Sequence, residues 1–143
     1  MKGLEVFHLT RRIMNVYEER CSSICKANNI NQNCLDVLLF LANNPEYNTA
    51  KDICEVRGIK SGIASVVVEK LIKKGYLERK VDEHDRRINR IFITEAASET
   101  VEQAQKIQKE FFIELLEDVT AEEIEVFKQM LGKLDDKIER MNN

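Results

Sequence analysis

The sequence has little glycine, little proline and no long apolar run. It contains five Gly and one Pro in 143 residues. Because these two residue types interrupt helices most strongly, their scarcity predicts a mostly helical chain with few long loops. No apolar run approaches the roughly 20 residues of a membrane-spanning helix, and no signal peptide follows Met1. We therefore expect a single soluble domain, residues 1–143, that is cytoplasmic and has no membrane partner.

The sequence is also poor in the patterns that carry catalytic or metal chemistry. A chain without a secretion signal is expected to keep its thiols reduced, and the cysteine spacing matches no zinc ribbon. The cysteines are Cys21, Cys25, Cys34 and Cys54, and the imidazoles are those of His8 and His84. No nucleophile–base pair, paired carboxylate or glycine-rich phosphate loop occurs at catalytic spacing. We expect no enzyme activity, no metal site and no cofactor.

Apolar spacing predicts a long first helix and a central second helix. In residues 4–27 one stripe recurs at spacings of three and four: Phe7, Thr10, Met14, Tyr17, Cys21 and Ile24. A second helix is predicted from Asn31, a suitable N-cap, to Ala42. Nearly every side of it is apolar between Cys34 and Leu41, which is typical of a helix that is buried all round.

Residues 49–75 predict two short helices joined by a tight turn, which is a helix-turn-helix pattern. The first begins at Thr49, where Asp52 can complete a capping box, and ends before Gly58. The second spans Lys60 to Lys74 and is closed by Gly75, which suits the left-handed position after a helix. Helical periodicity places one face of it on the core, namely Ala64, Val67, Val68 and Leu71, and the opposite face outside, namely Gly62, Val66, Glu69 and Lys73, with Ser65 and Lys70 on the flanks.

Two strand-like runs, residues 76–81 and 90–94, flank a charged turn at residues 82–87. We expect Leu77 and Val81 to alternate with Arg79, and the apolar residues of the second run to alternate with Phe92, so that one face of the ribbon is buried. A helix followed by such a ribbon is a winged helix, which offers one element to the major groove of DNA and another to the flanking groove.

The charge distribution supports a polyanion-binding surface in this region. The chain has 22 basic and 25 acidic residues, but residues 57–90 hold ten Lys or Arg and five Asp or Glu. That segment carries a net charge of +5, and the remainder, with twelve basic and twenty acidic residues, carries −8. A basic patch on an acidic protein is the footprint of a nucleic-acid partner. A solvated face with incidental lysines is the alternative.

The chain is predicted to be helical from residue 95 to its end. Thr120 and Glu123 form a capping box pattern before the last helix. That helix repeats an apolar seam at heptad spacing: Ile124, Phe127, Leu131, Leu134, Ile138 and Met141. Because such a seam is a pairing device, we favour a homodimer over packing of the terminal helices within one chain.

The chain resembles the MarR family of winged-helix transcription regulators over almost its full length. The resemblance rests on the turn Asp82-Glu83-His84-Asp85-Arg86-Arg87, on the strand Ile91-Phe92-Ile93-Thr94, and on the run from Leu71 to Arg79. It implies a winged helix-turn-helix, mostly α with a small β-ribbon, whose first and last helices form a homodimer interface. It also implies a region that senses a small-molecule effector. The expected DNA-binding lobe is about residues 30–94, and the dimerisation region is about residues 1–28 and 95–143.

These patterns identify candidate residues for contact with double-stranded DNA. They are Ser61, Gly62, Ser65, Val66, Glu69, Lys70 and Lys73 on the second short helix, and Asp85, Arg86, Arg87 and Arg90 on the ribbon. One of the two adjacent arginines is expected to enter the minor groove while the other pairs with Asp85. The sequence leaves open which arginine takes which part.

Cys21 and Cys25 lie one helical turn apart, near Arg20 and Lys26. They could form a redox switch, but we favour a role as small buried packing residues. The function we expect is a sequence-specific, ligand-responsive transcription regulator that acts as a dimeric repressor. The alternative is a winged-helix module that binds a protein, because apolar residues around Gly62 to Val66 dilute the start of the helix predicted from Lys60 to Lys74.

Overall fold

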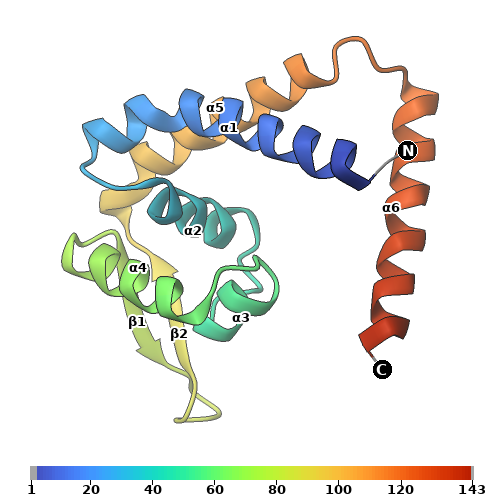
Figure 1. Cartoon of the computed structure of the whole chain (residues 1–143). Helices are drawn as coiled ribbons and strands as arrows, with labels where there is room; N and C mark the ends of the chain where they lie inside the picture. Colours follow the sequence, from blue (N-terminus) through green and yellow to red (C-terminus); the bar gives the residue numbers. More distant parts are fainter. Residues whose placement is uncertain (1–2, 143) are drawn as a thin grey trace. The chain divides into compact units, whose positions relative to one another are not determined.

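The computed structural model describes residues 3–142 and is mostly helical with one small antiparallel sheet (Figure 1). This confirms the predicted fold class of a winged helix-turn-helix. The elements in chain order are α1 (Gly3–Ala27), α2 (Gln32–Asn43), α3 (Ala50–Glu55), α4 (Ser61–Lys73), β1 (Leu77–Val81), β2 (Asn89–Ile93), the 3-10 turn η1 (Glu95–Ala97), α5 (Ser98–Leu115) and α6 (Ala121–Asn142). Among the described residues, no helix is both long and apolar enough to cross a bilayer.

The chain divides into two compact units, Met1–Lys109 and Glu110–Asn143. The core of the first unit is built around α2, which packs against α1, α4 and β2. Four of its side chains, Cys34, Leu35, Val37 and Leu38, are completely buried. The prediction of a central second helix is therefore confirmed, and its apolar surface on nearly every side is the physical reason.

The predicted helix ends are present. The Asn31 Oδ1 atom accepts a hydrogen bond of 2.9 Å from the Cys34 backbone N–H at the start of α2. At the start of α3, the Thr49 hydroxyl accepts from the Asp52 N–H, and the Asp52 carboxylate accepts from the Thr49 N–H. Gly75 has φ +81° after α4, a conformation that a residue with a Cβ rarely adopts.

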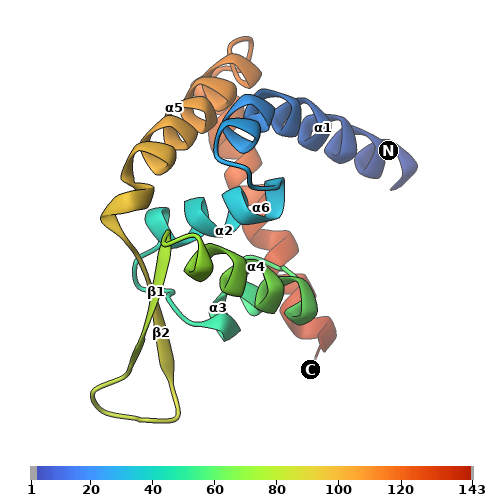
Figure 2. The same cartoon turned by 90° about the vertical axis from the view of Figure 1, so that its left-hand side faces the viewer.

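The two strands pair in antiparallel register, with Leu77 opposite Ile93, Arg79 opposite Ile91 and Val81 opposite Asn89. The expected alternation of Leu77 and Val81 with Arg79 is wrong, because residues two apart on a strand lie on the same face. Only the end of the ribbon nearest the helices is covered: Leu77 and Ile91 are buried, whereas Val81 is 55% exposed. Beyond this end the ribbon extends away from α2, α3 and α4, as Figures 1 and 2 show.

The second unit contains the end of α5 and all of α6. The predicted capping box at the start of α6 is confirmed: the Thr120 N–H donates to the Glu123 carboxylate at 2.9 Å, and the Glu123 N–H donates to the Thr120 hydroxyl at 3.2 Å. No described residue of α6 is buried. The heptad seam predicted there is therefore solvent-exposed, with Leu134 at 54%.

Candidate nucleic-acid interface

The exposed face of α4 is the face that the sequence predicts. Its four expected core residues, Ala64, Val67, Val68 and Leu71, are all buried. The seven candidate contact residues on this helix are all exposed: Ser61, Gly62, Ser65, Val66, Glu69, Lys70 and Lys73. Helix α4 thus presents a continuous face that a duplex groove can accept, because one helix fits the width of the major groove.

One residue on this face is held by a partner that the sequence reading missed. The Arg79 guanidinium of β1 donates to the Glu69 carboxylate of α4 at 2.6 Å. Both side chains are partly exposed, so the pair contributes little stability. Its consequence is electrostatic, since it neutralises the one carboxylate on the presented face of α4, which would otherwise repel phosphate. Strand geometry could have indicated this contact, because it places Arg79 on the same face as buried Leu77.

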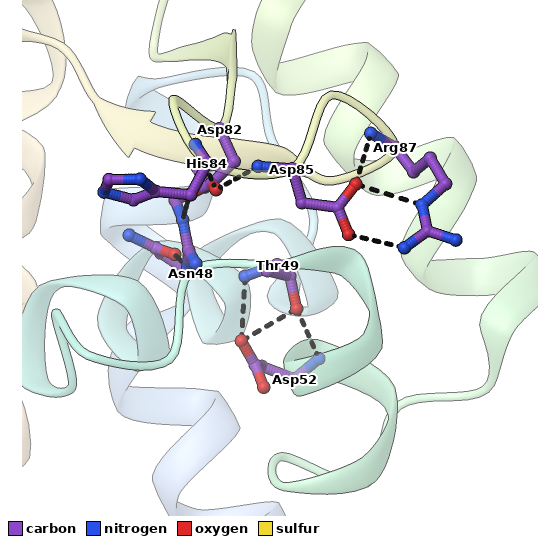
Figure 3. A network of polar contacts seen from close by, with 8 residues as sticks. Asn48, Thr49, Asp52, Asp82, His84, Asp85 and Arg87 are labelled. Carbon is purple, nitrogen blue, oxygen red and sulfur yellow. Dashed lines mark hydrogen bonds and ion pairs between the residues drawn. The ribbon is translucent and has the colours of Figure 1, made fainter.

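The turn between the strands settles which arginine pairs with Asp85. The Arg87 guanidinium donates to both carboxylate oxygens of Asp85, at 3.0 and 2.9 Å, and the Arg87 backbone N–H donates to the same carboxylate (Figure 3). These bonds lower the pKa of Asp85. Arg86 is exposed and, within residues 3–142, has no ion-pair partner. The geometry therefore leaves Arg86 as the arginine available to a ligand.

A second network fixes the turn to the rest of the lobe. Asp82 accepts hydrogen bonds from the backbone N–H groups of His84 and Asp85, at 3.0 and 2.9 Å, and from the Arg90 Nε atom at 2.5 Å. Arg90 also donates to the Asn48 side-chain oxygen at 2.8 Å. The hydrogen bond from Arg90, followed by those from the two backbone groups, lowers the pKa of Asp82 to about 2.

Arg90 therefore connects the ribbon to the segment that starts α3. Asn48 directly precedes Thr49, the N-cap of α3 (Figure 3). The Asn48 backbone carbonyl accepts a hydrogen bond of 2.7 Å from the Ile91 N–H. Arg90 was a candidate for direct DNA contact. In the structure its charge is already engaged by Asp82, so the residue is better placed to orient the ribbon than to contact a phosphate.

The basic segment contains fewer available charges than its composition indicates. Five of its basic side chains form ion pairs with carboxylates: Arg57, Arg79, Lys80, Arg87 and Arg90. Lys74 lies over the ring of Tyr76, 5.2 Å from its centroid. In the described part of the chain, ion pairs involve none of Lys60, Lys70, Lys73 and Arg86. The available positive charge is therefore located on α4 and at the tip of the ribbon.

The two neighbouring cysteines are packed inside the first unit. Cys21 is fully buried and Cys25 is 8% exposed. Burial is the main cause that raises the pKa of each thiol, so both are protonated and weakly nucleophilic near neutral pH. The environment favours packing over redox sensing. Among residues 3–142, no three metal-binding side chains lie close enough together to hold an ion.

A small polar cavity of about 210 Å³ lies between α1, α2 and α5 within the first unit. It is lined by Tyr17, Asp36, Arg57 and Gln108, among others. The Arg57 guanidinium lies 3.3 Å from the Asp36 carboxylate. Arg57 belongs to the α3–α4 turn, so this cavity touches the helix-turn-helix. The sequence reading missed it, although a carboxylate in the otherwise apolar α2 was a signal.

The comparisons with known proteins agree with this geometry. Residues 28–88 match the model described as MarR family. Over 88 residues, which make up 62% of the chain, the sequence is 27% identical to the uncharacterized HTH-type transcriptional regulator YwaE of Bacillus subtilis (strain 168). The match spans about half, 52%, of that relative's length.

Solved structures share the fold. The MarR protein from Peptoclostridium difficile DA00132 superposes with a TM-score of 0.76 and 20% identity, covering 96% of this chain and 86% of that one. The MepR–DNA complex of S. aureus gives a TM-score of 0.60 and 23% identity, covering 92% of this chain and 98% of that one. The elements that carry the interface described above therefore follow an arrangement that other chains also adopt.

The Asp82 network predicts an unusual titration. Its folded-state pKa lies below the ordinary value of 3.8, so its contribution to stability is present above that value and is lost as pH falls through about 2. In carbon-detected NMR, the Asp82 carboxyl resonance should stay constant from about pH 6 to pH 3. Arg90→Met should make it titrate within that range, whereas Arg87→Met, which disturbs Asp85 instead, should not. A wild-type midpoint near 3.8 would contradict the network.

The buried cysteines predict slow alkylation. At about pH 8, iodoacetamide should modify Cys21 and Cys25 at least about tenfold more slowly in the folded protein than in urea, because the thiols are protonated and covered. Cys54, which is less buried, serves as the internal control and should react first. Mass spectrometry of tryptic peptides gives the three rates. Folded-state rates equal to the unfolded ones would restore the redox interpretation.

Proposed function

We propose that the chain, which matches the MarR family model over residues 28–88, is a sequence-specific DNA-binding regulator that acts as a ligand-responsive, homodimeric repressor. The observation that supports this most directly is the pairing of an exposed α4 face with an exposed Arg86 at the ribbon tip. Both are on the same lobe, and both carry the positive charge that ion pairs leave available.

In the proposed complex, α4 lies in the major groove and the ribbon tip lies over the adjacent minor groove. Lys70 and Lys73 neutralise phosphates, and Arg86 enters the narrow groove where the negative potential is concentrated. Arg87 and Arg90 act on the turn itself, through Asp85 and Asp82. Fixing the turn before binding reduces the entropy that the ribbon loses when it docks.

Exposed apolar side chains support the proposed homodimer. On α1, Leu4 and Phe7 are 79% and 77% exposed. On α6, five of the six seam residues are exposed, and Ile124 is half-buried. Exposed apolar residues that recur along one helix mark an association site in a protein. A two-fold dimer would present two copies of α4, and dimeric helix-turn-helix proteins bind half-sites about 34 Å apart, one turn of the duplex.

The cavity at Tyr17 supports the proposed response to a ligand. A polar molecule that enters it meets Arg57 and Asp36, which bind each other in its absence. A ligand that binds Arg57 more strongly than Asp36 does would act directly on the α3–α4 turn. A shift of that turn changes the approach of α4 to the duplex, and so couples effector binding to DNA release.

The proposed contact of the ribbon tip with DNA is tested by removing the charge of Arg86. Arg86→Ala should weaken binding to duplex DNA from the region upstream of the protein's own gene by about tenfold, and should reduce the slope of log affinity against log salt by about 1. Arg11→Ala removes the same charge from α1 and should change neither quantity. Fluorescence anisotropy over a salt series measures both.

Two results would contradict these proposals. If Arg86→Ala and the wild type have the same affinity and slope, the ribbon tip is not in the interface. If the wild type binds no duplex at low salt, the DNA-binding function itself is rejected.

The dimer is tested in the α6 seam. Leu134→Asp places a charge where two chains are proposed to meet, and burial of an unpaired charge is costly. Light scattering should show a monomer or an aggregate in place of the dimer. Gln129→Asp introduces the same charge on the opposite side of α6 and should leave the dimer intact. An unchanged mass for the Leu134 variant would remove this seam from the interface.

A further inference from the structure

The first half of α4 lacks the side chains that usually read guanine, adenine and cytosine. Residues 61–68 are Ser, Gly, Ile, Ala, Ser, Val, Val and Val, without an Arg, Lys, Asn, Gln, Asp or Glu. Bidentate contacts from Arg or Lys select guanine, those from Asn or Gln select adenine, and a carboxylate selects cytosine. The N-terminal residues of a recognition helix are the ones that contact base edges. In α4 these residues offer only hydroxyl and apolar groups.

Val66 places methyl groups at the centre of the presented face. It is 68% exposed, more than any other large apolar side chain in residues 28–94. Gly62 lies one turn before it on the same face, and a Cβ added at Gly62 would meet nothing within 4 Å. No side chain therefore covers the helix backbone beside Val66 at Gly62, so a flat partner can approach the backbone closely there.

The surroundings of Val66 favour a polyanion as the occupant of this face. Glu69, one turn after Val66, is neutralised by Arg79 at 2.6 Å. Lys70 and Lys73 follow on the exposed side of the same helix. An apolar spot bordered by cations fits a methyl group in the groove of a nucleic acid, since phosphates flank that groove on both sides.

We propose that Val66 selects thymine by packing against its C5 methyl group, so that the preferred operator places a thymine opposite Val66 in each half-site. The inference rests on the proposed DNA-binding function and adds the base that the helix reads. Thymine is the one standard base with an apolar group in the major groove. The hydroxyls of Ser61 and Ser65 can accept or donate hydrogen bonds beside Val66, and they discriminate less between bases.

The test removes the thymine methyls without changing any hydrogen-bonding group. A duplex is selected from a random library with the full-length protein and is then remade with deoxyuridine at single thymine positions. Loss of the contacted methyl should weaken wild-type binding by about fourfold in each half-site, as expected for one buried methyl group. Because the contact is uncharged, this ratio should stay constant with salt while the overall affinity falls.

Variants connect the effect to Val66. Val66→Ala should bind the thymine and deoxyuridine duplexes equally, and Val66→Ile should retain the discrimination. Val56→Ala shortens another exposed valine of the lobe, 52% exposed and outside α4, and should discriminate as the wild type does. Thermal unfolding of each variant confirms that it is folded.

The outcomes separate this inference from the function on which it depends. Tight binding with no preference for thymine at any position rejects the inference and leaves the regulator intact. An equal preference in wild type and Val66→Ala also rejects it, because another residue then reads the methyl. If no duplex is selected, both fail, and the exposed Val66 is then assigned to contact with a protein.

Discussion

Burial of α2 is the constraint on which the rest of the lobe depends. A helix that is apolar on nearly every side must be covered on nearly every side, and here α1, α4 and β2 pack against it. This requirement fixes the orientation of α4, since its four buried residues face inward. The residues of α4 that do not face the core then form its presented face. The position of the candidate interface therefore follows from the packing of the core, and not from any interaction among the contact residues themselves.

The ribbon is positioned by polar contacts instead, because little of its surface is buried. Leu77 and Ile91 anchor one end in the core. Beyond that end, the ribbon is positioned by the hydrogen bonds to Asp82 and by the hydrogen bond from Arg90 to Asn48. Since Asn48 adjoins the capping box of α3, hydrogen bonds connect the ribbon directly to the helix-turn-helix. These bonds restrict the spacing between the two elements proposed to enter different grooves.

Local features of the fold could be read directly from the sequence. Asn31, Thr49 and Gly75 mark helix ends through short-range rules, and each takes its predicted role. The two faces of α4 also followed from periodicity alone. Such features depend on residues within a few positions of each other, where helix geometry leaves few alternatives.

The contacts that were missed join residues distant in the chain. Arg90 and Asn48 are 42 positions apart, and no local pattern indicates that they meet. The expected alternation of Arg79 with Leu77 and Val81 was wrong, because strand geometry places residues two apart on one face. The choice between Arg86 and Arg87 required side-chain geometry, since both flank Asp85 in the same turn.

If α4 reads DNA as proposed, the contact between Arg79 and Glu69 gives this fold a way to change its DNA preference from outside that helix. Arg79 lies on β1, yet it determines whether the Glu69 carboxylate is neutralised or available. A substitution at Arg79 would release a group that accepts a hydrogen bond from cytosine and repels phosphate. Related operators could therefore be separated by mutation at a position that touches no base. In the proposed complex, the set of residues that determines specificity would then be larger than the set that lines the groove.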